Sequence, residues 1–321
     1  MDLIYANTAK EDIGVMRDFT FDLAFGGDEN DFECRTMRGN HCCNIGYYLY
    51  CEGTEYGGVI DNIESNTDAD EVTYSGRTWH GVLNSKVLEP DVGEGYLILN
   101  GEANQILSHL IDRMGLSNLF SVPSIDSGIS ISNYKMNRYI RGYDGIRKML
   151  KTFGAKLNIV YKNGIVNLTT APLVDYSKND QFDTDQISLR ILKKGNPINH
   201  MICLGKGELV EREVIHLYTD KYGNICPDKT ITGIEEVCEI YENSNAETSD
   251  DLREGGIDKI NESWNSDEIE CEFNAGDESY DVGDIVGAKD NVTGVEVVIP
   301  VTKKIIKFDK NTIKIQYKVG E

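Results

Sequence analysis

The sequence predicts a mainly β protein with a small α/β insert, in which two β-barrel domains flank a helix-helix-hairpin unit. Short aromatic and β-branched runs fill the first hundred residues, helical stripes and a hairpin signal follow, and the last third returns to strand-like alternation. The chain has 321 residues, 40% of them hydrophobic, which suffices for two or three domains with cores of their own. The predicted domains are a first β-barrel at 1–98, the α/β unit at 99–180 and a second β-barrel at 181–321.

The first predicted barrel contains a clear strand near its start. Phe19–Phe25 alternates, so that its aromatic and leucine side chains share one face, and Gly26 and Gly27 end the run. Further short runs rich in aromatic and β-branched residues lie at 47–51, 56–60, 71–74, 82–83 and 87–88. Such runs, separated by Gly and Asp, predict a small barrel or sandwich.

The middle of the chain has helical periodicity. From Glu102 to Met114 the apolar residues recur at helical spacing, and Gly115 is placed to end the helix. A second helix is expected to begin with Asp144 as its cap and to end at Gly154. A hairpin is predicted next, because Asn163-Gly164 between two β-like runs is a strong two-residue turn signal.

The last third is expected to be a β-domain with one inserted helix. Candidate strands lie at 201–204 and 214–218, with a turn at 220–224. The helix is expected at about 249–264, where Thr248 and Asp251 form a capping-box pattern. The final strand alternates strictly, with these residues facing inward: Ile313, Ile315, Tyr317 and Val319.

The net charge of −22 argues against binding to nucleic acid, which needs lysine and arginine to replace phosphate counterions. The charge is uneven: residues 235–284 hold 18 acidic against two basic residues, and six lysines follow position 302. Two interpretations remain open, a solvated self-repelling surface or an acidic face that meets a basic partner or lines a passage.

The first five residues lack the basic and apolar regions of a secretory signal. No stretch approaches the ~18–20 apolar residues of a membrane span. We therefore expect synthesis in the cytoplasm, reduced thiols and no membrane insertion.

The cysteine-rich segment offers potential metal ligands, which are Cys34, His41, Cys42, Cys43 and Cys51. A structural zinc site favours ligand pairs separated by two to four residues, whereas Cys42 and Cys43 are adjacent. Neighbours in a strand point to opposite faces, so both cannot easily bind one ion. The sequence therefore predicts packed, reduced thiols and no metal.

Catalytic patterns are incomplete. No spacing selects a Cys–His pair, and the Ser-x-x-Lys pattern from Ser132 to Lys135 lacks the companion motifs of acyl-enzyme formation. The Gly-Lys-Gly turn at 205–207 is not a phosphate-binding loop, and a glycosidase-like pair cannot be picked out among the 54 acidic residues. We expect no catalytic residues and no cofactor.

Three residues are candidates for a subunit interface: Arg77, Trp79 and Arg212. Trp and Arg are enriched among the side chains that dominate protein interfaces, and Arg212 lies beside the Gly-Lys-Gly turn. For Trp79 two interpretations stay open, a core side chain at the end of a strand or an exposed anchor.

Four stretches carry a resemblance to a known family: 72–83, 199–208 with Arg212 and the turn at 220–224, 251–260, and 280–286 running into the last strands. Their order resembles the baseplate-hub family of phage tails. The resemblance is greatest to the siphophage-type hubs of prophages and of phage-tail-like bacteriocins from Gram-positive bacteria.

The resemblance implies a non-enzymatic homotrimer, whose two β-barrels per chain build a ring with pseudo-six-fold symmetry. Such a ring joins the tail tube protein to a trimeric spike or tip protein and contacts other baseplate proteins. Its acidic lumen would let DNA or a tape-measure protein pass. The implied location is the tail baseplate of a virion or phage-tail-like particle made in the bacterial cytoplasm.

Two other functions stay open from the residues alone. The 17 tyrosines could supply the exposed aromatic rings of a carbohydrate-binding host-attachment module. A cell-wall hydrolase is the other alternative.

Overall fold

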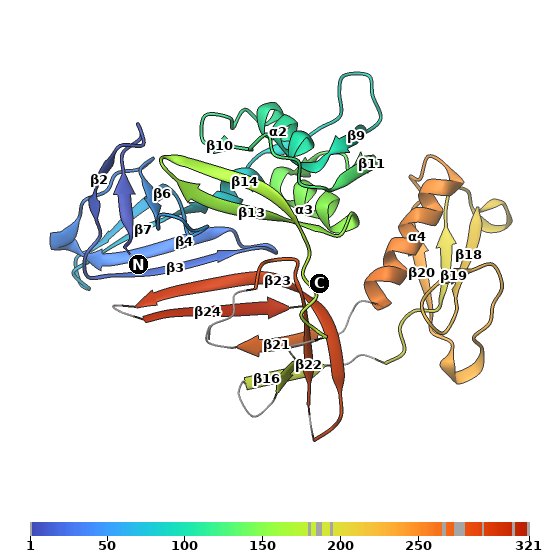
Figure 1. Ribbon diagram of the computed structural model, residues 1–321. Coiled ribbons are helices and arrows are strands. Elements are labelled where there is room, and N and C mark those ends of the chain that lie inside the picture. The colour runs from blue at the N-terminus through green and yellow to red at the C-terminus, as the bar shows by residue number, and fades with distance from the viewer. Residues whose placement is uncertain are drawn as a thin grey trace. The chain divides into compact units, whose positions relative to one another are not determined.

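The computed structural model describes residues 2–178, 181–183, 188–192, 195–264, 268–272, 280–290, 292–309 and 312–319. In these residues strands dominate and four α-helices occur, which confirms the predicted mainly β class with a helix-helix-hairpin insert (Figure 1). The chain forms two compact units. Unit 1 consists of Met1–Gln181, Cys271–Gly287 and Pro300–Lys318, and unit 2 of Phe182–Glu270, Ala288–Ile299 and Val319–Glu321.

The helices and strands have the following bounds. The helices are α1 Trp79–Asn84, α2 Ala103–Arg113, α3 Gly142–Thr152 and α4 Ser249–Trp264, with short 3-10 turns at Arg38–Asn40, Leu209–Glu211 and Gly233–Glu235. The strands up to residue 172 are β1 Ile4–Ala6, β2 Asp12–Val15, β3 Phe19–Phe25, β4 Asp31–Met37, β5 Tyr48–Tyr50, β6 Gly57–Asn66, β7 Glu71–Thr78, β8 Val87–Leu88, β9 Leu97–Glu102, β10 Phe120–Ser121, β11 Ser130–Met136, β12 Ile140–Arg141, β13 Ala155–Lys162 and β14 Ile165–Pro172. The later strands are β15 Gln181–Asp183, β16 Ser188–Leu192, β17 His200–Leu204, β18 Val214–Thr219, β19 Ile225–Cys226, β20 Cys238–Glu242, β21 Glu268–Glu272, β22 Ile285–Lys289, β23 Glu296–Asp309 and β24 Thr312–Val319.

The main sheet of unit 1 includes the strand order β24-β23-β3-β4-β7-β6-β5-β1-β2. β3 has the predicted bounds, and its alternation buries Phe21, Leu23 and Phe25. Phe21 lies opposite Cys34 of β4 and Phe308 of β23, so one face of these strands builds a core. β3 and β23 are far apart in the sequence, and local patterns cannot predict their pairing.

The helix-helix-hairpin unit has the predicted order and element types. Asn163 and Gly164 have positive φ values of 54° and 78°, as the two-residue turn between β13 and β14 requires. α2 ends where Gly115 adopts a φ of 69°. α3 begins at Gly142, ahead of the expected cap, so Asp144 lies in the first turn of the helix instead.

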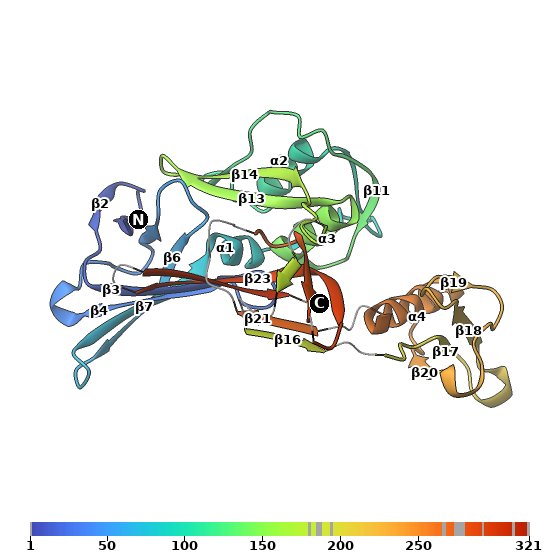
Figure 2. The ribbon, with the colours of Figure 1, turned by 60° about the horizontal axis from the view of Figure 1, so that its bottom comes forward.

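The helix α1 corrects one expectation, because the sequence indicates a strand at 82–83. These residues belong to α1, which follows directly on β7 (Figure 2). Thr78 caps α1, since its side chain accepts a hydrogen bond from the Gly81 amide at 3.3 Å. A helix of 6 residues is too short to show a helical period, so only the cap could indicate it.

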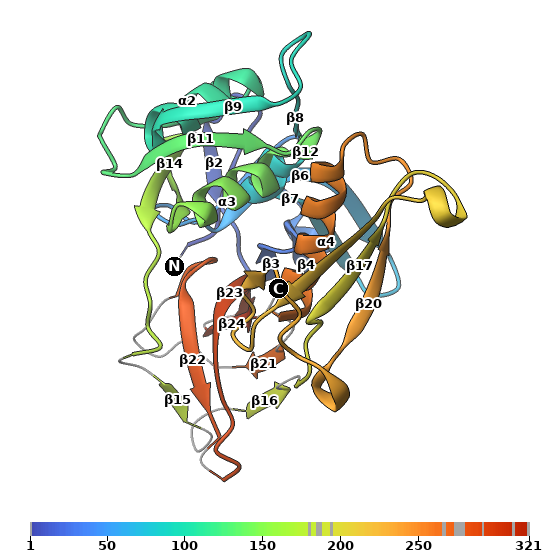
Figure 3. The ribbon, with the colours of Figure 1, turned by 90° about the vertical axis from the view of Figure 1, so that its right-hand side faces the viewer.

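Unit 2 contains a four-stranded sheet in the order β19-β18-β17-β20, with β20 parallel to β17. α4 packs on one face of this sheet (Figure 3). The predicted capping box is present, with Thr248 and Asp251 exchanging two hydrogen bonds of 3.0 and 3.1 Å. The buried residues of its core are Met201, Cys203, Leu217, Ala246, Leu252 and Ile260.

Two details differ from expectation. The sheets of the described residues are open in their strand order, so these β-rich regions are not closed barrels. In β24, Ile315, Tyr317 and Val319 are buried as predicted, whereas Ile313 near the start of the strand is exposed.

The division into three domains with boundaries at 98 and 180 stays a prediction. Among the helices described, none has the length and apolarity to cross a membrane.

Candidate functional site

The outer face of the main sheet in unit 1 carries an acidic groove. The alternation that buries Phe21 and Leu23 turns Asp22 outward, and the register places Asp22 beside Glu33 on β4 and Lys307 on β23. The groove has a volume of about 620 Å³. Its charged lining residues are Asp22, Glu29, Asp31, Glu33, Asp61, Arg77 and Lys307.

Carboxylates outnumber cations in this groove, and burial and neighbouring charges both shift their pKa values. Burial raises the pKa of Asp22 and that of Asp31, and a neighbouring carboxylate adds to each increase. Glu29 differs, because a hydrogen bond from Lys303 lowers its pKa. A basic side chain from a partner would relieve this repulsion, so the groove suits a cationic surface.

Arg77, a predicted interface residue, lies in the groove. Its guanidinium donates two hydrogen bonds to Asp61, at 2.8 Å from Nε and 2.7 Å from a terminal nitrogen. This pairing raises the pKa of Arg77 and orients the side chain, which remains partly exposed. A partner would therefore meet an arginine that is already ordered, which lowers the entropic cost of binding.

Trp79, the second predicted interface residue, is fully buried. Its ring stacks on Tyr161 with centroids 5.2 Å apart, and Gly57 leaves room for it, since a Cβ there would lie 2.9 Å from the indole. Of the two interpretations kept open, this burial supports the core side chain. The exposed-anchor interpretation is corrected, because a ring without solvent-accessible surface in the subunit offers none to a partner.

Arg212, the third predicted interface residue, lies in unit 2 at the end of the loop between β17 and β18. Its Nε donates to the Gly205 carbonyl at 3.3 Å, and its guanidinium pairs with Glu242 of β20. Arg212 is thus held by two partners from different parts of this unit, as Arg77 is held in unit 1.

The same loop exposes two adjacent aliphatic side chains. Leu209 and Val210 are 93% and 99% accessible, although both are apolar. Leu209 also has a φ of 50°, a backbone conformation that is uncommon for a residue other than glycine. Uncovered aliphatic side chains beside an ordered arginine have the composition of a docking surface.

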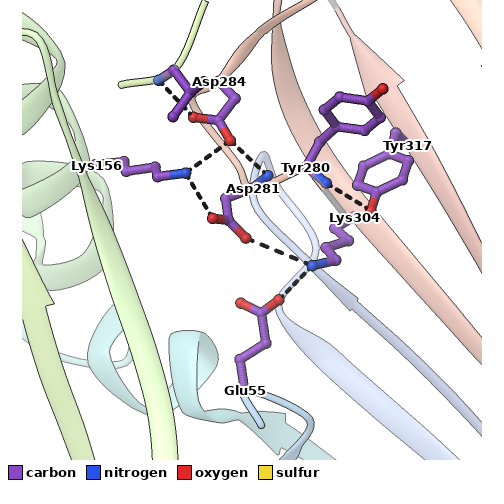
Figure 4. A network of polar contacts seen from close by, with 8 residues as sticks. Glu55, Lys156, Tyr280, Asp281, Asp284, Lys304 and Tyr317 are labelled. Atoms are coloured by element: carbon purple, nitrogen blue, oxygen red, sulfur yellow. Dashed lines mark hydrogen bonds and ion pairs between the residues drawn. The ribbon is translucent and has the colours of Figure 1, made fainter. Parts of the chain in front are cut away.

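A buried ion network ties distant segments of unit 1 together (Figure 4). The ammonium of Lys156 on β13 lies 2.7 Å from Asp281 and 2.8 Å from Asp284. The ammonium of Lys304 on β23 lies 2.7 Å from Glu55 and 3.8 Å from Asp281. The side chains of Asp284 and Lys304 are 0% and 2% exposed, so these charges depend on one another.

Opposing effects set the pKa values in the network. Burial raises the pKa of Glu55, and the nearby Lys304 offsets only part of that increase. For Lys304, burial acts to lower the pKa, but Glu55 and two tyrosines outweigh it and the pKa is raised. His80 in the adjacent core has a pKa lowered to about 3 by burial and by Lys304, so it stays neutral.

The cysteines of the cysteine-rich segment have free thiols, and so do the other cysteines whose side chains the structure describes. The argument that Cys42 and Cys43 point to opposite faces is wrong, because residues 41–44 are not in a strand. Their sulfur atoms lie 3.7 Å apart, and the Cys42 sulfur lies 3.3 Å from that of Met16. The hydrogen bond with Cys43 lowers the pKa of Cys42 to about 7.

Within the described residues, one group of His, Cys and acidic side chains has metal-ligand spacing: His200, Glu236 and Cys238 in unit 2. The sequence does not reveal this group, because only the parallel pairing of β17 with β20 brings His200 beside Cys238. The spacing of Glu236 and Cys238, two positions apart, is the one signal visible in the sequence.

Comparison with solved structures shows that the chain has the fold of prophage tail proteins. The crystal structure of the prophage tail protein gp18 from Listeria monocytogenes EGD-e matches with a TM-score of 0.57 and 10% identity, over 100% of this chain and 94% of that one. The 43 kDa tail protein of prophage MuSo2 from Shewanella oneidensis matches with a TM-score of 0.59 and 11% identity, over 99% and 98%.

A third solved structure, the tail protein from Neisseria meningitidis MC58, matches with a TM-score of 0.55 and 12% identity, over 100% of this chain and 96% of that one. No family model and no curated protein matches the sequence. At these identities the likeness is one of fold, and it covers the whole chain rather than a single domain.

Proposed function

We propose that the chain is a structural, non-enzymatic subunit of a phage tail or phage-tail-like particle. The observation that carries this proposal is the fold shared with three tail proteins over nearly the full length of each chain. We further propose the position of a baseplate hub, in which a homotrimeric ring joins the tail tube to the spike or tip protein. The resemblance of the four sequence stretches supports this finer assignment.

Two surfaces are proposed to make the contacts. The acidic groove around Arg77 would receive a basic surface of a neighbouring tail protein, because its carboxylates are crowded and only partly neutralised. The loop that carries Leu209, Val210 and Arg212 would bury its aliphatic side chains against a second partner. The overall acidic charge favours passage of DNA or a tape-measure protein through the ring, since a negative lumen repels DNA.

The decisive experiment is co-expression of the chain with its neighbouring tail genes, followed by electron microscopy and mass measurement. A three-fold ring at the end of a tube is the expected result. A protein that stays monomeric at high concentration and does not bind tube and spike proteins would contradict the hub assignment and favour the carbohydrate-binding alternative.

Replacement of both Leu209 and Val210 by Asp tests the loop directly. Assembly should fail while the isolated subunit stays folded, because both side chains are already in water and Asp tolerates a positive φ better than Leu. The matched control replaces Ile234 and Val292, two equally exposed aliphatic residues of unit 2, by Asp. Normal assembly of the Leu209/Val210 variant would remove this loop from the proposed interface.

A further inference from the structure

The face of the unit 2 sheet opposite α4 gathers polar and metal-binding side chains. Met201 and Cys203 of β17 pack in the core with α4, so the alternating residue His200 points to the other face. In the register of the parallel pair, His200 lies directly opposite Cys238 of β20. Glu236 precedes Cys238 by two positions in extended backbone, which places its carboxylate on the same side.

These three side chains converge. A ligand atom from each of His200, Glu236 and Cys238 lies within 4.8 Å of the other two, and His200 Nδ1 is 2.8 Å from Glu236 Oε1. Around a tetrahedral zinc ion with bonds of about 2.0–2.3 Å, ligand atoms lie roughly 3–4 Å from one another. Small side-chain movements therefore suffice to close this group around an ion. Imidazole nitrogen, carboxylate oxygen and thiolate sulfur are also the donor types that bind zinc in proteins.

A second observation concerns the other ring nitrogen of His200. His200 Nε2 lies 2.9 Å from Nδ1 of His216 on β18, and His200 is buried. A metal-bound histidine usually donates its free ring N–H to a fixed acceptor, which sets its tautomer and orientation. His216 is in place for that role, so the first ligand is already held on a strand with its supporting partner.

We propose that unit 2 binds one zinc ion through His200 Nδ1, the Glu236 carboxylate and the Cys238 thiolate, with water as the fourth ligand. His216 acts as a positioning residue through its hydrogen bond to His200. The ammonium of Lys229 lies 2.6 Å from Glu236 Oε1 and competes with the ion for that carboxylate. Its long side chain can move away into solvent when the ion binds.

The ion has a structural purpose in this part of the fold. β20 lies at one edge of the four-stranded sheet, and the hydrophobic cluster that this sheet forms with α4 has the six buried residues named above. A metal can supplement a hydrophobic cluster that buries little apolar surface. Zinc would fasten the start of β20 to the start of β17, and thereby stabilise unit 2.

Cobalt(II) titration of the reduced, metal-stripped full-length protein tests the proposal. Cobalt occupies tetrahedral zinc sites, and a thiolate ligand gives a charge-transfer band in the near ultraviolet. We expect one cobalt per chain, displaced by zinc, and loss of the band in Cys238→Ser. The matched control is Cys226→Ser, which removes a thiol from strand β19 of the same sheet and should leave the band unchanged.

Further variants test the residues that contact the proposed metal ligands without binding the ion. His216→Phe should weaken cobalt binding by roughly 10–100-fold, as expected for loss of a partner that orients a ligand. His216→Asn retains an acceptor near the position of Nδ1 and should restore most of the affinity. Lys229→Met should tighten binding, because the competing cation is gone.

Two results would overturn the proposal. One is the absence of a thiolate band in the wild-type protein at saturating cobalt. The other is a band that survives in Cys238→Ser and disappears in Cys42→Ser, which would place the metal in the cysteine-rich segment of unit 1.

Discussion

The two units differ in how much of their stability comes from their own buried contacts. Unit 1 buries a large cluster of apolar side chains and adds an ion network whose members Lys156, Asp284 and Lys304 are nearly inaccessible. Unit 2 has a small core under one helix, and it exposes aliphatic side chains such as Leu209 and Val210 almost completely. We therefore expect unit 1 to be self-sufficient, whereas unit 2 gains stability from what it binds.

The two tryptophans allow this difference to be measured. Trp79 lies in the core of unit 1, and Trp264 lies in unit 2, where its Nε1 donates to the Ile198 carbonyl at 2.8 Å. The fluorescence of Trp264→Phe therefore reports unfolding of unit 1, and the fluorescence of Trp79→Phe reports unfolding of unit 2. Separate transitions in denaturant would be the direct sign of unequal stability.

The largest expected effect comes from breaking the ion network of unit 1. Lys156→Met leaves Asp284 buried beside Asp281 without its cation, which should cost about 3–5 kcal/mol in the free energy of unfolding. Urea unfolding followed by Trp79 fluorescence measures this loss. The control Lys178→Met removes an exposed lysine paired with Asp175 and should change stability by less than about 0.5 kcal/mol. Equal losses in the free energy of unfolding would show that the buried ion network stabilises unit 1 no more than an exposed ion pair does.

A slightly smaller effect is expected in the core of unit 2. Leu252→Ala truncates a fully buried residue of α4, at a cost of about 2–4 kcal/mol. Because unit 2 starts from a small core, this loss should abolish its transition by Trp264 fluorescence while the Trp79 signal stays unchanged. Leu209→Ala is the matched control, since that leucine is almost fully exposed. Simultaneous loss of both transitions would contradict the unequal stability of the units.

The smallest effect concerns the first turn of α2 in unit 1. Glu102 caps this helix, its carboxylate accepting hydrogen bonds of 2.9 Å from the amides of Asn104, Gln105 and Ser127. Burial acts to raise the pKa of Glu102, but a hydrogen bond from the Ser127 hydroxyl, together with those from the three amides, outweighs it and lowers the pKa to about 2. Glu102→Ala should cost about 1 kcal/mol near neutral pH, a loss that unit 1 tolerates.

The lowered pKa of Glu102 also predicts a pH dependence. A carboxyl group with a depressed folded-state pKa contributes stability above its unfolded pKa of about 4.3, and this contribution is lost as the pH falls toward 2. The stability difference between wild type and Glu102→Ala, measured by urea unfolding, should therefore shrink over that range. If this stability difference stays constant from neutral pH to about pH 2, the charge of Glu102 does not contribute to the stability of unit 1.

Local signals in the sequence predicted local structure well. The turn at Asn163-Gly164 and the capping box of Thr248 and Asp251 each depend on neighbours within a few residues, and both are present. The helix α1 escaped prediction because it is short and its apolar residues continue a β-like run.

Pairings between distant segments could not be predicted. The ion network depends on Lys156 meeting Asp281 and Asp284 across more than a hundred residues, and the meeting of His200 with Cys238 depends on a parallel register. Trp79 illustrates the same limit, because no local pattern indicates that a hairpin strand will cover its ring. Residue types indicated which side chains could form a site or an interface. Only the fold determined which of these side chains contact one another.

The two adjacent aromatic residues at the start of α1 have a consequence for how this protein can be divided. Trp79 stacks on Tyr161 of the hairpin strand β13, whereas its neighbour His80 stacks on Phe25 of the main sheet, with ring centroids 4.2 Å apart. One short helix thus packs into the sheet and the hairpin at the same time. A fragment that ends before the hairpin would lose the Tyr161 ring from one face of the indole, so we expect the first β-rich region and the helix-hairpin region to fold best when they are expressed together.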